Sequence, residues 1–167
     1  MIWHVVTLFP EAMDVFLSVG VLGRAREKNL VRINFVNPRD FTEDRHRTVD
    51  DVPYGGGAGM VLKPDPLFRA VRHIRSGSSA AMPVWLTSPH GRLLTDGLAR
   101  ELAAVPEQII VCGHYGGVDD RVREKLAGGE ISIGDYVLTG GETAAVAIID
   151  SAARYVSGVV GNEGSVR

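Results

Sequence analysis

The sequence predicts an α/β fold with a mostly parallel sheet flanked by helices. Short apolar segments rich in β-branched residues alternate with segments of helical periodicity, a pattern typical of parallel sheets with crossover helices. The chain has 167 residues, of which 45% are hydrophobic and 23% charged, as is ordinary for a globular protein. We therefore expect a single domain over residues 1–167 with its own apolar core.

The first predicted elements are two strands separated by two short helices. Residues 2–9 (IWHVVTLF) are apolar and β-rich, which predicts a buried strand. Pro10 suits the first turn of a helix over residues 11–19, and residues 19–29 favour a second helix. Residues 30–37 (LVRINFVN) alternate apolar and polar side chains, as a half-exposed strand does.

A long polar and glycine-rich connection follows at residues 38–62. A connection of this length inside a compact domain is usually functional or mobile. Residues 24–47 hold seven Arg or Lys against four Asp or Glu. Such a patch could bind phosphates, although charged segments more often form a solvent-exposed face.

The remaining segments continue the alternation. Residues 64–75, 95–105 (with Thr95 as its N-cap), 119–127 and 141–156 favour helices. Residues 82–88 and 107–113 predict buried strands, and residues 131–138 predict a strand or a strand followed by a turn.

Three of the predicted strands break abruptly into glycine, proline or serine. The breaks are "LTSPHG" (86–91), "VCGHYGG" (111–117) and "IGDYVLTGG" (133–141). Ligands of open α/β sheets bind at the carboxyl ends of the strands. If these strands are neighbours, the three loops converge on one site.

The familiar catalytic motifs are missing from the sequence. "GGGAG" (55–59) has neither the lysine of a Walker A loop nor the spacing G-x-G-x-x-G, and H-E-x-x-H and G-x-S-x-G do not occur. His46 is close to Asp44 and Asp50, but no matching nucleophile accompanies it, which disfavours acyl transfer. A single cysteine, Cys112, excludes an internal disulfide and a cysteine zinc cluster, and its apolar surroundings indicate a buried structural thiol.

We expect a cytoplasmic protein without a membrane partner. No apolar stretch reaches about 18 residues, and the first residues have no basic region or cleavage site of a signal peptide. The formal charge of −2 gives no overall attraction to nucleic acid.

The three glycine-rich loops favour a site built largely from backbone. Glycine lets the chain approach a ligand closely, and backbone N–H and C=O groups can read the edge of an adenine. Leu138, Ile133 and Tyr115 could form an apolar slot for a flat ring, which suits an adenine-containing cofactor. From the residues alone, tight turns without a ligand explain the same pattern equally well.

Several motifs, in order and over almost the whole chain, resemble the bacterial tRNA (guanine-N1)-methyltransferase family of the SPOUT class. They are "LFPE" (8–11), "PRDFTEDRHRTVDDVPYGGGAGMV" (38–61), "SPHGR" (88–92), "VCGHYGGVDDRV" (111–122), "SIGDYVLTGGE" (132–142) and "GVVGNE" (158–163).

The resemblance implies a SPOUT fold with a deep C-terminal trefoil knot and a homodimer with its active site between subunits. It implies bent S-adenosylmethionine as cofactor and tRNA as partner, methylated at N1 of the guanine beside the anticodon. The residues that match the cofactor loops are Leu86, Thr87, Ser88 and Pro89; Gly113 and Tyr115; Ile133, Gly134, Asp135, Tyr136, Val137 and Leu138; and Gly140 and Gly141.

The resemblance also assigns roles in the chemistry. N1 of guanine carries a proton at neutral pH, so a general base must remove it while O6 gains negative charge. By resemblance, Arg154 stabilises that charge, although an arginine that balances the helix dipole is the alternative. His46 and Asp50 match residues that handle the substrate, Arg24 matches a tRNA contact, and the family implies Mg²⁺ at a position that the sequence leaves unknown.

The sequence departs from the family pattern at several positions. The family's usual base is an aspartate just beyond the point that matches Arg167, and a helical domain that binds tRNA follows it. Gly116 stands where glutamate is common, His114 where arginine is frequent, and Ala58 and Ala144 where prolines are usual.

We therefore expect residues 1–167 to bind the cofactor but not to transfer the methyl group alone. Either the chain is truncated, or it is a knotted dimeric binding module that has lost catalysis, which the internal change at Gly116 would favour. A SPOUT methyltransferase that acts on another RNA is a weaker alternative, because residues 38–61 match the tRNA guanine group closely.

Overall fold

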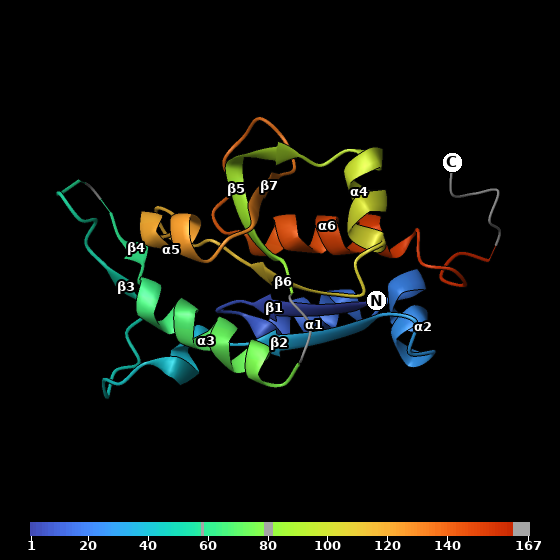
Figure 1. Cartoon of the computed structure of the whole chain (residues 1–167), viewed down its shortest axis with the longest axis horizontal. Coiled ribbons are helices and arrows are strands. Elements are labelled where there is room, and N and C mark those ends of the chain that lie inside the picture. The colour runs from blue at the N-terminus through green and yellow to red at the C-terminus, as the bar shows by residue number, and fades with distance from the viewer. Residues whose placement is uncertain (58, 79–81, 162–167) are drawn as a thin grey trace.

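The computed structural model of the chain describes residues 1–57, 59–78 and 82–161. Its centre is a five-stranded sheet in the order β2-β1-β6-β5-β7, in which every neighbouring pair is parallel (Figure 1). The strands are β1 (Ile2–Val6), β2 (Arg32–Val36), β5 (Val84–Leu93), β6 (Glu107–Val111) and β7 (Gly129–Ser132). The predicted α/β class and the mostly parallel sheet are confirmed.

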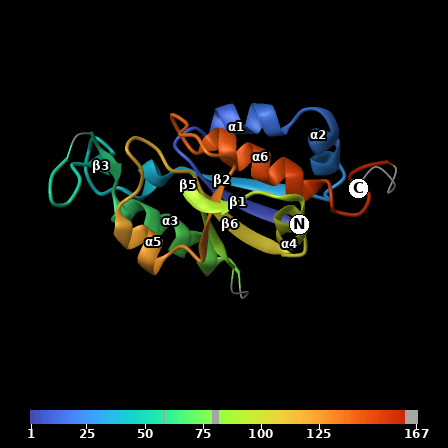
Figure 2. The same cartoon turned by 90° about the horizontal axis from the view of Figure 1, so that it is seen from above.

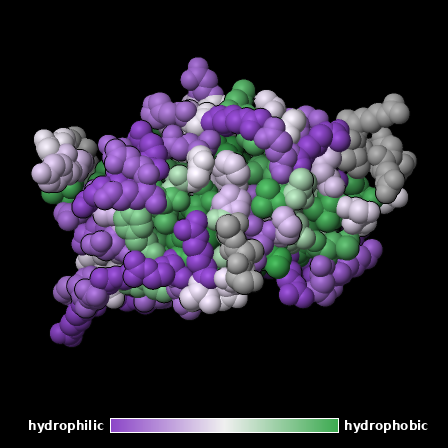
Figure 3. Space-filling view, viewed as in Figure 1, coloured by the Kyte–Doolittle hydropathy of each residue, from purple (hydrophilic) through white to green (hydrophobic). Residues whose placement is uncertain are grey.

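Helices cover both faces of this sheet. They are α1 (Pro10–Leu17), α2 (Gly20–Glu27), η1 (Pro38–Phe41), α3 (Pro64–Ser76), α4 (Asp96–Ala103), α5 (Asp120–Lys125) and α6 (Glu142–Ala153). Figure 2 shows α1 and α6 on one side of the sheet and α3 and α5 on the other. On the face drawn in Figure 3, hydrophobic residues are visible towards the centre between hydrophilic ones.

The two-residue period of the strands separates the core into two layers. Trp3 and Val5 of β1 pack on the layer that contains α1, α2, α4 and α6, whereas Val6 packs on the layer that contains α3 and α5. Ile110 and Ile109 of β6 divide in the same way. Successive strand side chains point to opposite faces, so a strand buried on both sides is apolar throughout, as the sequence indicated.

The long polar connection contains more structure than predicted. It holds η1 and a small antiparallel pair of strands, β3 (Asp50–Asp51) and β4 (Val61–Leu62). Asn37 caps η1, since its side-chain oxygen accepts a hydrogen bond from the N–H of Arg39 at 3.0 Å. Ala58, discussed above as a departure from the family, lies outside the described residues, as do residues 162–167.

Of the two alternatives predicted for residues 131–138, the structure agrees with a strand that gives way to a turn, and the strand ends at Ser132. β7 ends there, and residues 133–141 form a loop that leads into α6. The strand predicted at residues 82–88 instead runs on to Leu93, with a register shift against β7 between Thr87 and Arg92. Ile131 pairs with both of these residues, so residues 88–91 bulge out of the ladder at the carboxyl end of β5.

Candidate functional site

A cavity of about 200 Å³ lies where the three glycine-rich loops meet, beyond the carboxyl ends of β5 and β6 and before α6. We call it the glycine-lined cavity. Its lining consists of residues 87–89, 113–117, 131–134, 136–141 and Ala144. The convergence expected from the sequence is therefore present in the structure, at the sheet edge where ligands of parallel α/β folds bind.

All but two of the predicted cofactor residues line this cavity. The exceptions are Leu86, which is 2% exposed and belongs to the apolar core, and Asp135, which is exposed outside the lining. Leu86 precedes the cavity-lining Thr87 on β5, so the strand alternation places it on the opposite face.

Hydrogen bonds tie the three loops together. The N–H of Gly113 donates to the Thr87 hydroxyl at 3.0 Å, and that hydroxyl donates to the Val111 carbonyl at 3.3 Å. The N–H of Gly141 donates to the Gly113 carbonyl at 2.6 Å. A Cβ atom on Gly141 would lie only 2.0 Å from the Thr87 hydroxyl oxygen, so only glycine fits where the third loop crosses the other two.

The walls of the glycine-lined cavity leave apolar side chains in contact with solvent. Val137 is 82% exposed, Tyr136 54% and Leu138 39%, all from the loop before α6. In the described part of the chain, residues 135–138 take no part in backbone–backbone hydrogen bonds outside helices and strands. Apolar walls with unused backbone donors and acceptors fit a flat heterocycle such as adenine.

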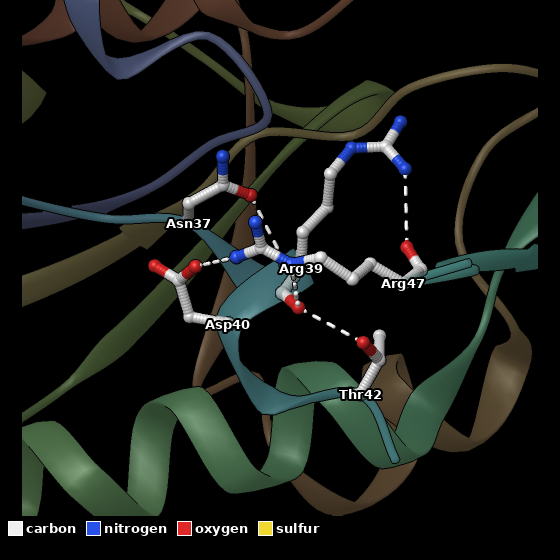
Figure 4. Close-up of polar contacts among 5 residues, drawn as sticks. All are labelled: Asn37, Arg39, Asp40, Thr42 and Arg47. Atoms are coloured by element: carbon white, nitrogen blue, oxygen red, sulfur yellow. Dashed lines mark hydrogen bonds and ion pairs between the residues drawn. The ribbon is translucent and has the colours of Figure 1, made fainter. Parts of the chain in front are cut away.

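Arg39, in the long polar connection, contacts the rim of this cavity at Tyr115. This residue adopts a left-handed backbone conformation with φ of 60°, and its hydroxyl accepts a hydrogen bond from Arg39 at 3.5 Å. Figure 4 shows how Arg39 is held: it donates to the Arg47 carbonyl at 3.1 Å, and Arg47 pairs with Asp40. Residues 37–47 therefore place the guanidinium of Arg39 next to the cavity, within a segment that holds three arginines against three acidic residues.

The predicted substrate residues are not brought into the cavity. His46 is exposed in the long polar connection, and Asp50 begins β3. Arg24 is exposed on α2, and Figures 1 and 2 place α2 and β3 at opposite ends of the molecule. Each of the three is accessible, but they do not form one cluster within the chain.

Arg154 is also distant from the glycine-lined cavity in the same chain. It follows the last turn of α6 and is exposed, whereas Gly141 precedes the first turn. The 12 residues of α6 separate the two by about 18 Å at 1.5 Å per residue. The next residue, Tyr155, fixes this end of α6 against α4, because its hydroxyl bonds to Asp96 and Arg100 stacks 4.3 Å above its ring.

Sequence reasoning missed several lining residues, of which His114 carries the most chemistry. Its ring makes T-shaped contacts with Phe9 at 5.2 Å and with Tyr115 at 4.9 Å between centroids. It also borders a second cavity of about 390 Å³, the apolar cavity, which Phe9, Phe16 and Glu142 help to line. His114 lies inside the "VCGHYGG" loop, so that run could have indicated it.

Gly116, the position where the family commonly has glutamate, lies against the hairpin of β3 and β4. Its N–H donates to the Met60 carbonyl at 2.8 Å, and a Cβ atom there would lie 3.0 Å from that oxygen. A side chain at this position would therefore need a small shift of the Met60 backbone.

Cys112 is the buried structural thiol that the sequence predicted. It is 2% exposed, and burial raises the pKa of its thiol well above the ordinary value, with the charge of Glu142 adding to the effect. Within the described ranges, no group of three or more His, Cys, Asp or Glu side chains is placed to hold a metal ion. No helix in those ranges combines the length and hydropathy needed to cross a bilayer.

Comparisons with known proteins agree with the resemblance. The model of the family described as "tRNA (Guanine-1)-methyltransferase TrmD" matches residues 1–167. The chain is 53% identical to a tRNA (guanine-N(1)-)-methyltransferase of Dehalococcoides mccartyi over 161 residues, which cover 96% of this chain and 65% of that protein. It is 49% identical to the protein of the same name from Chloroflexus aggregans, over 98% of this chain and 64% of that protein.

A solved structure is similar as well. The crystal structure of tRNA (m1G37) methyltransferase from Aquifex aeolicus superposes with a TM-score of 0.89 at 36% identity, over 97% of this chain and 72% of that one. The chain spans just under two thirds of the length of the two relatives named above. Because the family model matches it from residue 1 to residue 167, the chain belongs to the tRNA (guanine-1)-methyltransferase family.

Proposed function

We propose that the chain is the S-adenosylmethionine-binding domain of a tRNA methyltransferase that modifies N1 of the guanine beside the anticodon. The names of the relatives and of the Aquifex aeolicus enzyme support this reaction. The single observation that carries the proposal is the convergence of three loops on a glycine-lined cavity with exposed apolar walls. Similarity to proteins named as methyltransferases does not favour the alternative of a module that has lost catalysis.

In this proposal the loop before α6 holds the adenine. Ile133, Leu138 and Tyr136 flank the ring, and the unused backbone groups of residues 135–138 read its edge. The bound cofactor supplies an electrophilic methyl group on a sulfonium. No nucleophile of the protein is then needed, because the guanine nitrogen itself attacks once its proton has been removed.

We propose a homodimer in which the active site forms between two copies of the chain. Arg154 lies about 18 Å along α6 from the cavity of its own chain, so it can stabilise O6 only at the site of a second copy. The dimer has a suitable surface, since Val15, Phe16 and Val19 on and after α1 are 71%, 64% and 62% exposed. Contiguous exposed apolar side chains of this kind mark protein interfaces.

Other expectations from the resemblance remain proposals. The close crossing of Gly141 against Thr87 and Gly113 supports a C-terminal knot. Arg24, His46 and Asp50 are proposed to contact tRNA, and the guanidinium of Arg39, which bonds to the Tyr115 hydroxyl, is proposed to attract its phosphates. A Mg²⁺ requirement and a cytoplasmic location are proposed from the family.

A two-part experiment tests the proposed function. Calorimetric titration of the chain with S-adenosylhomocysteine should give saturable binding, and absence of binding would contradict the cofactor site. Residues 1–167 alone are expected to bind the cofactor without transferring the methyl group, so for the second part the chain is joined to the C-terminal part of a longer relative. The joined protein is incubated with S-adenosylmethionine and a tRNA transcript, with and without EDTA, and the digested tRNA is analysed for 1-methylguanosine by mass spectrometry.

Methylated guanine should appear only when guanine stands beside the anticodon. Arg154→Lys should lower methylation strongly while leaving cofactor affinity unchanged, because Arg154 does not line the cavity of its own chain. Methylation of another base, or of a transcript with adenine at that position, would contradict the proposed reaction.

A further inference from the structure

His114 forms part of the wall between two cavities. It lines the glycine-lined cavity on one side and the apolar cavity on the other. Its ring is held between Phe9 and Tyr115, and its backbone forms an isolated antiparallel bridge with Gly140. The position of the imidazole is therefore fixed by contacts on both sides and from the loop before α6.

One nitrogen of this imidazole lacks a hydrogen bond. In the described part of the chain, Nδ1 of His114 is buried without a hydrogen-bond partner. The nearest acidic oxygen is Oε2 of Glu142, at 3.7 Å. A neutral imidazole leaves Nδ1 unsatisfied at this distance, whereas a protonated imidazole is attracted to the carboxylate.

Glu142 is itself anchored. Its other carboxylate oxygen, Oε1, accepts a hydrogen bond from the Thr7 hydroxyl at 2.9 Å, and Glu142 is the first residue of α6. A carboxylate is favourable at this positive end of a helix. The bond from Thr7 links the end of β1 to the start of α6, and the Thr7 hydroxyl also accepts a hydrogen bond from the N–H of Phe9 at 3.1 Å.

The two side chains meet directly over Gly140. A Cβ atom on Gly140 would lie 2.5 Å from Oε2 of Glu142 and 2.6 Å from Nδ1 of His114. Gly140 and its neighbour Gly141 line the glycine-lined cavity. Any change in the distance between His114 and Glu142 therefore acts on the backbone turn that closes that cavity.

We infer that His114 and Glu142 are a positioning pair whose attraction, when the imidazole is protonated, fixes the turn at Gly140 and strengthens cofactor binding. The inference rests on the proposed function, since it concerns the same cavity. Imidazoles change charge between about pH 5 and 8 while carboxylates stay ionised, so affinity should rise as pH falls through this range. The pair thus makes cofactor affinity depend on pH.

Other ionisable side chains of the described residues face the pair. Tyr115 packs against the imidazole from the same loop, and Arg39 contacts the Tyr115 hydroxyl from the long polar connection. Tyrosine and arginine keep their charge states between pH 5 and 8. Cys112 follows the last residue of β6, close enough for the charge of Glu142 to act on its thiol. Burial raises the pKa of this thiol well above its ordinary value, so the thiol also stays neutral.

The test is the pH dependence of S-adenosylhomocysteine affinity, measured by calorimetry at several values between pH 6 and 8. This thioether carries no sulfonium, so charge repulsion between donor and imidazolium does not enter. For the unmodified chain we expect the affinity at pH 6 to be about fivefold higher than at pH 8, because a partly exposed ion pair contributes an effect of this size. His114→Gln and Glu142→Gln should bind at every pH with the weaker affinity, without this dependence.

His114→Arg gives the complementary result, because a permanent cation should keep the tight affinity across the range. His4→Gln is the matched control. His4, in the middle of β1, and Glu107, the first residue of β6, form a second pair at 2.9 Å, and loss of this pair should leave the pH profile unchanged. Thermal unfolding of each variant shows whether it is folded.

The outcomes separate the inference from the proposed function. If the unmodified chain does not bind S-adenosylhomocysteine at any pH, the proposed function fails. If it binds with the same affinity at every pH, or if the folded His114→Gln and Glu142→Gln chains keep the full pH dependence, the positioning pair is refuted.

Discussion

Substitution of Gly141 by alanine tests the crossing of the three loops. A Cβ atom at this position would lie 2.0 Å from the Thr87 hydroxyl oxygen, 2.7 Å from the Gly113 nitrogen and 3.1 Å from the Cys112 Cα. Two of these three atoms are backbone atoms at the end of β6, in the middle of the sheet. They cannot yield without moving the strand itself.

The cost can be worked out from these contacts. Overpacking a well-packed site costs about 1–3 kcal/mol. The Thr87 hydroxyl must also turn away, which removes the hydrogen bond that it accepts from Gly113 and costs about 1 kcal/mol more. We therefore expect Gly141→Ala to lower the free energy of unfolding by about 2–4 kcal/mol, measured by urea denaturation.

Gly97→Ala is the matched control. Gly97 lies in α4, where a Cβ atom would meet only the Thr95 hydroxyl oxygen at 3.8 Å. Alanine in a helix is favoured over glycine, so this change should stabilise the chain by about 0.5–1 kcal/mol. If the free energy of unfolding of Gly141→Ala differs from that of the unmodified chain by less than about 0.5 kcal/mol, the three loops do not cross as closely as described.

Three further predictions address burial, ionisation and the cavity wall. Because burial raises the pKa of the Cys112 thiol, Ellman's reagent at pH 8 should label it much faster in urea than in the folded chain. The hydrogen bond with His4 holds the pKa of Glu107 below its ordinary 4.5. The ionised Glu107 therefore stabilises the folded chain above that pH, and this stabilisation is lost as the pH falls through the lowered pKa. Glu107→Gln should make the free energy of unfolding, measured by urea denaturation, depend less on pH in this acid range. Val137→Asp, at an 82% exposed site, should weaken S-adenosylhomocysteine binding by calorimetry without lowering the melting temperature.

Elements that are buried on both faces could be predicted from the sequence. The apolar runs at β1 and β6 are long enough to fill both layers of the core, and such runs are typical of parallel sheets. For residues 133–138 the sequence left strand and turn open, because Ile133, Val137 and Leu138 are apolar. A sequence does not distinguish apolar side chains that pack in a core from those that line a cavity and stay exposed.

The candidate site could be predicted only where it is made of consecutive residues. Glycine-rich loops indicated most of the cavity lining, but the bond between Thr7 and Glu142 joins residues 135 positions apart, which no local pattern encodes. The resemblance selected Arg154 by its motif, and motif spacing could not show that it lies at the far end of α6 from the cavity. Only the folded topology determines those distances.

The most direct test of the cofactor site is a map of backbone amide shifts in an isotope-labelled chain titrated with S-adenosylhomocysteine. We predict that the largest shifts fall in residues 113–117 and 133–141, with smaller ones at Thr87 and Ser88. The control residues around Gly97 in α4 should not shift. Shifts concentrated on another surface, or a spectrum unchanged at saturating ligand, would contradict the account.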